Sequence, residues 1–196
     1  GTLGFLTEIE QENMYTALEK LMKDEYILES RMMLKGTMYH NGKPMYTDIA
    51  LNDIVLNRSG ALRIVNYEIY VNGEFLYSCP ADGIIISTPT GSTGYNLSAG
   101  GPIVSPSSFM TLLTPICPHT FNTRTVILSP YDVVEIEIAH GRDGKNQEVE
   151  VNFDGNYKED LYSNDRVIIK RAIETTKIVK LSEESFLEVL HSKMRD

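Results

Sequence analysis

The chain has 196 residues, of which 42% are hydrophobic and 23% are charged, as in a folded globular domain and unlike a disordered or fibrous protein. Its formal net charge of −9 argues against nucleic acid as a main partner, because binding to a phosphate backbone needs a cationic face. The apolar runs are far shorter than the roughly 18 residues of a membrane-spanning helix. We therefore expect neither nucleic acid nor a membrane among the partners.

Amphipathic helices are predicted near both ends of the chain. Within residues 8–24, Tyr15, Leu18 and Leu21 recur at a spacing of three residues with charges between them, so we expect these side chains to lie in a core or an interface. Near the other end, Ser182 and the two glutamates after it predict an N-cap and an acidic first helical turn.

The residues between these helices carry a β pattern. Leu28, Met32, Leu34 and Met38 fall on even positions, a period of two that ends at a turn over 41–44. Asn72-Gly73 is a strong hairpin signal, and the apolar run over 84–86 is typical of a buried strand. Further strands are predicted over 67–71, 74–79, 125–128, 133–138, 148–153, 167–171 and 177–181. So many short strands predict a sandwich or a related all-β domain.

The two cysteines, Cys79 and Cys117, do not form a Cys-x-x-Cys motif. They predict no disulfide framework and no zinc site, which fits a reducing cytoplasm, and we expect Cys117 to be buried and unreactive. The four histidines show no spacing of metal ligands, so no metal site is predicted. The chain begins with Gly1 rather than Met, and its first residues lack the basic and apolar regions of a signal peptide, so we expect the chain to be part of a longer protein.

Residues 80–106, PADGIIISTPTGSTGYNLSAGGPIVSP, form a stretch too long for a simple turn. Its glycines let backbone N–H groups approach a ligand, and its hydroxyls can bind one. A helix beginning at Thr93 would present free N–H groups to an anion or a polar ligand. A glycine-rich loop without a ligand explains the same residues equally well. The stretch is neither a Gly-x-Gly-x-x-Gly motif nor a Walker A motif.

Residues 81–106 resemble the signature segment of the NAD kinases, the enzymes that phosphorylate NAD to NADP. Segments over 3–7, 50–53, 117–120 and 153–156 resemble further motifs of that family in the same order. The resemblance implies a mainly β, β-sandwich-like C-terminal NAD-binding domain of a two-domain kinase. We expect an inter-domain segment and helix over 1–25, the all-β domain over 26–181 and a C-terminal helix over 182–196.

The sequence departs from the family in several places. The Gly-Gly-Asp-Gly loop, which binds ATP phosphates and whose Asp is taken to be the general base, has no counterpart, because the one Gly-Gly here precedes Pro102. We therefore expect no catalytic residue in this chain, a base upstream of Gly1, and no activity from the fragment alone. The Asn-Glu motif is Asn52-Asp53 here, Pro80 stands where relatives often have Arg or His, and Gly94 stands where they often have Ala.

The resemblance also implies a set of NAD-binding residues. Asn52 and Asp53 would bind ribose hydroxyls, Asp82 the nicotinamide carboxamide, and Arg63 another part of the dinucleotide. Taken alone, these residues are equally explained as turn or strand-edge positions and, for Arg63, as a solvated charge. Beyond them, a cradle and a turn beside the substrate are implied at Thr90, Thr93, Gly94, Tyr95, Asn96, Ser98, Asp154 and Asn156.

The implied reaction is transfer of the ATP γ-phosphoryl group to the 2′-hydroxyl of the adenosine ribose of NAD. ATP would carry a divalent metal ion such as Mg²⁺, and the enzyme would be a cytoplasmic homodimer or homotetramer. Two alternatives stay open. One is a lipid or sphingoid-base kinase of the related superfamily, against which the polar 80–106 stretch argues. The other is a non-catalytic NAD-binding or oligomerisation module.

Overall fold

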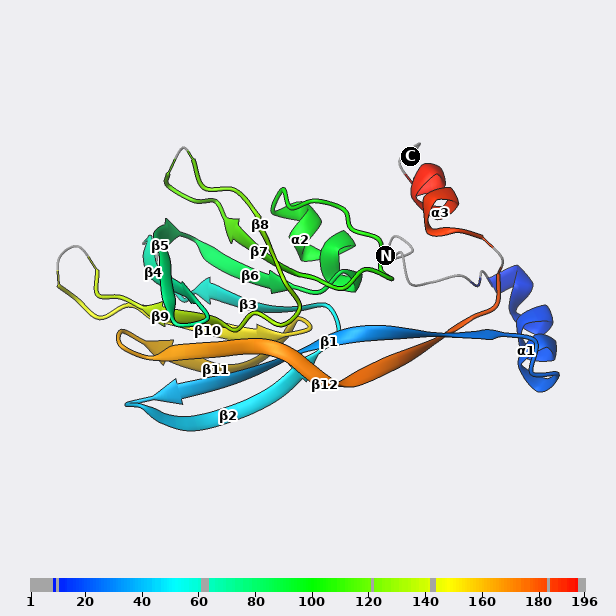
Figure 1. The fold of residues 1–196 in the computed structure, drawn as a ribbon, viewed down its shortest axis with the longest axis horizontal. Helices are drawn as coiled ribbons and strands as arrows, with labels where there is room; N and C mark the ends of the chain where they lie inside the picture. The colour runs from blue at the N-terminus through cyan, green and yellow to red at the C-terminus, as the bar shows by residue number, and fades with distance from the viewer. Residues whose placement is uncertain are drawn as a thin grey trace.

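The computed structural model describes residues 9, 11–60, 64–120, 122–141, 144–182 and 184–193, with only the backbone at 157–158. Within these residues, twelve strands form two six-stranded sheets that pack against each other (Figure 1). Every pairing between neighbouring strands is antiparallel. The predicted mainly β architecture is confirmed. No helix in the described part of the chain is long and apolar enough to cross a bilayer.

The first sheet has the strand order β2-β1-β12-β9-β4-β5 and the second has the order β11-β10-β3-β6-β7-β8. The strands of the first sheet are β1 (Ile27–His40), β2 (Lys43–Ala50), β4 (Val65–Val71), β5 (Glu74–Ala81), β9 (Val134–Ile138) and β12 (Arg166–Lys180). Those of the second are β3 (Asp53–Arg58), β6 (Gly83–Ser87), β7 (Thr111–Ile116), β8 (Val126–Leu128), β10 (Glu148–Phe153) and β11 (Asn156–Tyr162).

The predicted hairpins form as expected. Asn72 and Gly73 have φ values of 54° and 81°, which a two-residue hairpin turn requires and which Asn and Gly tolerate best. The turn between β1 and β2 has the same pair of residue types, with φ values of 50° at Asn41 and 75° at Gly42. The two predicted strands at 167–171 and 177–181 are instead one strand, β12, which pairs with β1 through a register shift near Met32.

The core lies between the two sheets. It is one cluster of buried apolar side chains to which strands of both sheets contribute. The side chains of Ile84 and Ile86 in β6 are fully buried in this cluster. Strand β7, which the sequence did not predict, is buried over its whole length, so it lacks the alternation of a half-exposed strand.

Short helices complete the fold. After β6 the chain forms η2 (Thr90–Thr93), a 3₁₀ turn, and α2 (Tyr95–Ser98). Near the ends of the chain lie η1 (Gln11–Asn13), α1 (Met14–Met22) and α3 (Phe186–Lys193). In Figure 1, α1 lies at the end of the long β1–β12 ribbon, away from the packed sheets.

The terminal helices differ in part from the predictions. Tyr15 is 76% exposed and Leu18 is 49% exposed, which excludes a core position in the described chain and leaves the predicted alternative of an interface. The N-cap of α3 is Ser185 rather than Ser182. The backbone N–H of Glu188 donates to the Ser185 hydroxyl (3.3 Å), and the Ser185 N–H donates to the Glu188 carboxylate (2.6 Å). This reciprocal capping box satisfies two free donors at once, which a cap at Ser182 would not do at this helix start.

Candidate functional site

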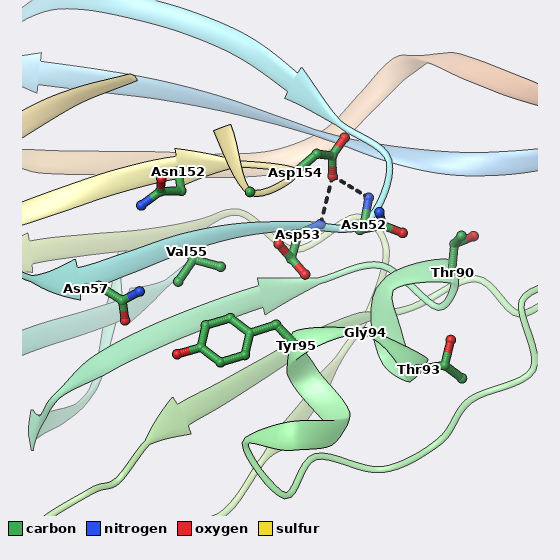
Figure 2. Close-up of a pocket in the computed structure, with 11 residues that line it drawn as sticks. Asn52, Asp53, Val55, Asn57, Thr90, Thr93, Gly94, Tyr95, Asn152 and Asp154 are labelled. Carbon is green, nitrogen blue, oxygen red and sulfur yellow. Dashed lines mark hydrogen bonds between the residues drawn. The ribbon is translucent and has the colours of Figure 1, made fainter. Parts of the chain in front are cut away.

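A cavity of about 570 Å³ opens on the second sheet beside η2 and α2, and we call it the main groove. Its volume lies within the roughly 300–1,000 Å³ typical of small-molecule sites. Figure 2 shows its side chains converging from β3, β10 and the η2–α2 segment. The residues that line it are Asn52, Asp53, Val55, Asn57, Thr90, Thr93, Gly94, Tyr95, Asn152, Asp154 and Gly155.

Successive side chains of β3 alternate between the core and the main groove. Ile54 and Leu56 point into the core between the sheets and are fully buried there. Asp53, Val55 and Asn57 point to the opposite face and line the main groove. The same strand therefore anchors the site in the core and presents polar side chains to a ligand.

The carboxylate of Asp154 holds the turn that precedes β3. One oxygen, Oδ1, accepts hydrogen bonds from the backbone N–H groups of Asn52 (2.7 Å) and Asp53 (3.2 Å) (Figure 2). The other oxygen, Oδ2, accepts one from the Leu51 N–H (2.8 Å). The Asp154 N–H donates to the Asp53 carbonyl oxygen (3.0 Å). Asp154 adopts a φ of 50°, a left-handed conformation that Asp tolerates better than most residues. We call this set of bonds the Asp154 clamp.

The carboxylate of Asp53 is the buried acidic group of the groove, with only 6% of the residue exposed. Burial is the main cause that raises its pKa, to about 6, and the nearby negative charge of Asp154 adds to the effect. Asp53 thus changes charge within one or two pH units of neutrality. A ligand hydroxyl that donates to the ionised form would compensate part of this desolvation.

The η2–α2 segment is bonded directly to the clamped turn. The Thr88 hydroxyl donates to the Leu51 carbonyl oxygen (2.6 Å), and the Thr88 N–H donates to the Asn52 carbonyl oxygen (2.9 Å). Gly91 passes so close that a Cβ there would lie 2.1 Å from the Asn52 carbonyl oxygen. Glycine at position 91 is therefore required for this approach, which brings Thr90 and Thr93 to the groove.

The side chain of Asn96 is buried and is fully engaged within the protein. Its Nδ2 donates to the carbonyl oxygens of Ser92 (3.0 Å) and Pro102 (3.1 Å), and its Oδ1 accepts from the Thr114 hydroxyl (2.6 Å). The amide ties α2 to the segment after it and to β7. Asn96 is not among the residues that line the groove.

The other implied site residues lie around the groove. Seven of the twelve are brought together: Asn52, Asp53, Thr90, Thr93, Gly94, Tyr95 and Asp154. Ser98 is exposed at the end of α2, and Asn156 is exposed in the turn after Asp154. Neither side chain lines the groove. Arg63 and the segment 3–7 fall outside the described residues.

Asp82 lies beyond the Asn57 end of β3. Its carboxylate forms an ion pair with the Arg58 guanidinium (3.1 Å), and its carbonyl oxygen accepts from the Arg58 N–H (2.9 Å). Asn57 pairs with Gly83, the residue after Asp82, in the β3–β6 register. Asp82 is therefore next to the groove but is not among its lining residues.

Sequence reasoning missed four lining residues: Val55, Asn57, Asn152 and Gly155. A signal for two of them was present, since the period of two from Asp53 points to Val55 and Asn57.

The prediction that Cys117 is buried was wrong, because Cys117 is exposed. It has a φ of 45° in the turn after β7, where the neighbouring His119 N–H donates to the Pro80 carbonyl oxygen (2.8 Å). The described residues include no group of three His, Cys, Asp or Glu side chains able to hold a metal ion.

We expect Asp154→Ala to destabilise the protein by about 1.5–3 kcal/mol, because three backbone N–H groups lose a charged acceptor. The same change should weaken ligand binding in the groove by freeing Asn52 and Asp53. Urea denaturation measures the first effect. Asn156→Ala is the matched control in the same turn, since the Asn156 side chain donates one long hydrogen bond of 3.5 Å, to the Asp154 carbonyl oxygen. Equal stability of the two variants would contradict the role assigned to the clamp.

Comparisons with known proteins agree on one family. Residues 51–181 match the family model described as the ATP-NAD kinase C-terminal domain. The NAD kinase of Lachnoclostridium phytofermentans is 46% identical over 198 residues, which cover 100% of this chain and 70% of that protein. The NAD kinase of Agathobacter rectalis is 47% identical over 194 residues, with 99% and 68% covered.

Solved structures support the same assignment. Yeast NADH kinase complexed with NADH has a TM-score of 0.89 and 29% identity, over 100% of this chain and 56% of that one. An NAD kinase from Archaeoglobus fulgidus in complex with ATP shares the fold, with a TM-score of 0.76 and 24% identity over 98% of this chain and 70% of that one. The chain spans about 70% of the bacterial relatives and little more than half of the yeast chain. It belongs to the NAD kinase family and contains that family's C-terminal domain.

Proposed function

We propose that this chain forms the NAD-binding part of an enzyme that transfers the γ-phosphoryl group of ATP to the 2′-hydroxyl of the adenosine ribose of NAD. The family assignment supports the reaction class. The observation that carries the proposal is the Asp154 clamp, which holds Asn52 and Asp53 at the floor of a groove of ligand size. The chain's task would be to orient the acceptor ribose.

Each groove residue has a role that suits a dinucleotide. The Asp53 carboxylate and the Asn52 amide can accept hydrogen bonds from ribose hydroxyls. Tyr95 is 42% exposed beside them and offers an aromatic face to a planar ring. The hydroxyls of Thr90 and Thr93 lie across the groove from Asn57 and Val55 (Figure 2). We propose that Asp82, beyond the Asn57 end of the groove, binds the nicotinamide carboxamide. Arg63 is proposed as a further contact with the dinucleotide.

In the proposed reaction, the 2′-oxygen bonds to the γ-phosphorus as the bond from that phosphorus to the β–γ bridging oxygen breaks. The products are NADP and ADP, and the hydroxyl proton passes to a base. We place that base outside this chain, because the Gly-Gly-Asp-Gly sequence is absent from it. Mg²⁺ would arrive with ATP, since this ion is commonly held by substrate phosphates and few protein groups. The described residues offer no metal cluster, so no step here is assigned to the ion.

We also propose that the enzyme is cytoplasmic and that it assembles as a homodimer or a homotetramer. The exposed apolar side chains of α1, among them Tyr15, Leu18 and Met22, support an interface there. We keep the proposed division into an inter-domain segment and helix over 1–25, an all-β NAD-binding domain over 26–181 and a C-terminal helix over 182–196.

The groove lining disfavours a lipid acceptor. Asn52, Asp53, Asn57 and Asn152 place amides and a carboxylate where an acyl chain would need apolar walls. The test is to measure phosphorylation of NAD and of diacylglycerol by the full-length protein with ATP. NADP formation supports the proposal. Diacylglycerol phosphorylation, or NAD binding without turnover by the full-length protein, would contradict it. The chain 1–196 alone should form no NADP.

We expect Asn52→Ala to lower kcat and to raise the KM for NAD, because a misoriented hydroxyl raises the reaction barrier as well as weakening binding. Asp53→Glu should be tolerated, since Glu is the family's residue at this position. Steady-state kinetics of the full-length variants measures both effects. An unchanged kcat in Asn52→Ala, together with loss of activity in Asp53→Glu, would make the pair structural.

We expect NAD binding to strengthen as the pH rises through about 6 and then to level off, because the ionised Asp53 carboxylate is the better acceptor for ribose hydroxyls. Calorimetric measurement of the NAD dissociation constant from pH 5 to pH 8 would show the step. In Asp53→Asn the step should disappear. A step of the same size in that variant would assign the titration to another group.

A further inference from the structure

The carboxylate of Asp53 is buried and has no donor of its own. Asp53 is 6% exposed, and its N–H and carbonyl oxygen are bonded to Asp154. Its carboxylate accepts no hydrogen bond from any residue that the structure describes. In Figure 2 the side chain points from β3 toward the η2–α2 segment, across the main groove. A buried acceptor without a donor is costly, so a ligand that donates hydrogen bonds would stabilise it.

The backbone N–H groups around this carboxylate are already engaged. Three consecutive N–H groups, at residues 51–53, form the kind of concavity that binds anions, and the Asp154 carboxylate occupies it. Across the groove, three further N–H groups donate within their own segment, those of Gly91, Ser92 and Gly94. An anionic ligand beside Asp53 would therefore find these six backbone donors used by the protein itself.

The main groove also contains no cation to balance a ligand's negative charge. None of the described residues that line it is Lys, Arg or His. Two arginines border it, and each is engaged with a carboxylate. Arg58, at the end of β3, forms an ion pair with Asp82 (3.1 Å), and Arg31, in a smaller neighbouring cavity, forms one with Glu29. A phosphate in the groove would thus meet two carboxylates and no positive side chain.

We propose that Asp53 makes the main groove select an unphosphorylated ribose, so that NAD binds more tightly than NADP. The inference rests on the proposed function and deepens it, because NADP is the product of that reaction. Ribose hydroxyls can donate to the Asp53 carboxylate, whereas a 2′-phosphate offers acceptor oxygens and about two negative charges. Like charges repel strongly in a partly buried site, because the effective dielectric constant there is low.

The selection acts after the phosphoryl transfer. ATP brings its own counterion into the reaction, whereas free NADP brings its 2′-phosphate alone. The transfer replaces a hydroxyl that can donate to Asp53 with a dianion that cannot. The interaction that holds the substrate thereby becomes one that repels the product, which favours release of NADP and hinders its rebinding in competition with NAD.

The selectivity is measured directly by calorimetric dissociation constants of the full-length protein for NAD and for NADP, at pH 8 and 0.15 M salt. The carboxyl of Asp53 is ionised at this pH, since its pKa is raised to about 6. We expect NADP to bind at least about tenfold more weakly than NAD, the effect of losing one charge-assisted hydrogen bond.

Substitutions at position 53 should change the ratio of the two dissociation constants rather than both constants together. Asp53→Asn should bring them to within about threefold of each other, because the amide is neutral and can donate to a phosphate oxygen. Asp53→Glu keeps the charge and should keep the selectivity. If thermal unfolding shows that Asp53→Asn misfolds, the smaller neutral variant Asp53→Ser takes its place, with the same expected loss of selectivity.

Glu148→Gln is the matched control for the loss of a carboxylate. Glu148 lies on the same face of β10 as the lining residue Asn152, four residues away, which is roughly 13 Å along a strand. Because charges are screened over about 8 Å at physiological salt, this change should leave the ratio as in the wild type. An equal change of the ratio in Glu148→Gln and Asp53→Asn would overturn the assignment to Asp53.

Failure of the inference and failure of the proposed function give different results. A protein that forms NADP but binds NAD and NADP equally, or keeps its selectivity in Asp53→Asn, has the reaction without this selection. Equal weakening of NAD and NADP binding in Asp53→Asn would also overturn the inference, because the residue would then only shape the site. A full-length protein that binds neither dinucleotide lacks the proposed function, and the inference is wrong with it.

Discussion

The site depends on one carboxylate, which accepts hydrogen bonds from three backbone N–H groups. Asp154 comes from the turn between β10 and β11, and its bonds to residues 51–53 fix the turn before β3. Thr88 extends the same unit to η2 through the carbonyl oxygens of Leu51 and Asn52. Segments more than a hundred residues apart thus hold one another in place. Side chains that face the ligand from such a rigid unit lose little conformational entropy when the ligand binds, and this favours affinity.

The sandwich supplies the rigidity that this unit needs. Strand β3 lies between β10 and β6 in its sheet, and its core-facing residues Ile54 and Leu56 are fully buried. Displacing Asp53 would therefore disturb the packing between the sheets, because its neighbours cannot move without opening cavities.

Local patterns predicted local structure well. The Asn-Gly hairpin at 72–73 and the buried strand at 84–86 were predicted because turn conformation and burial on both faces leave direct traces in sequence. Features decided by distant contacts were not predictable. The exposure of Cys117 and the internal bonding of Asn96 depend on segments that meet only in the fold. Most residues of the main groove were named in advance only through the family resemblance. Their residue types alone fitted a turn or a strand edge as well as a ligand site.

Asp at position 53 links the geometry of the groove to its electrostatics. An aspartate carboxylate reaches about one methylene less far than the family's glutamate, so here it stays within the buried floor beside Asp154. Burial, and to a lesser extent the neighbouring charge of Asp154, raises the pKa of this carboxyl to about 6. A ribose must then approach more closely, or a water molecule must bridge the gap. The groove volume of about 570 Å³ leaves room for such a bridge. The backbone that sets this distance is the one that the Asp154 clamp holds, so the clamp controls both the reach and the charge of the residue that we propose orients the acceptor.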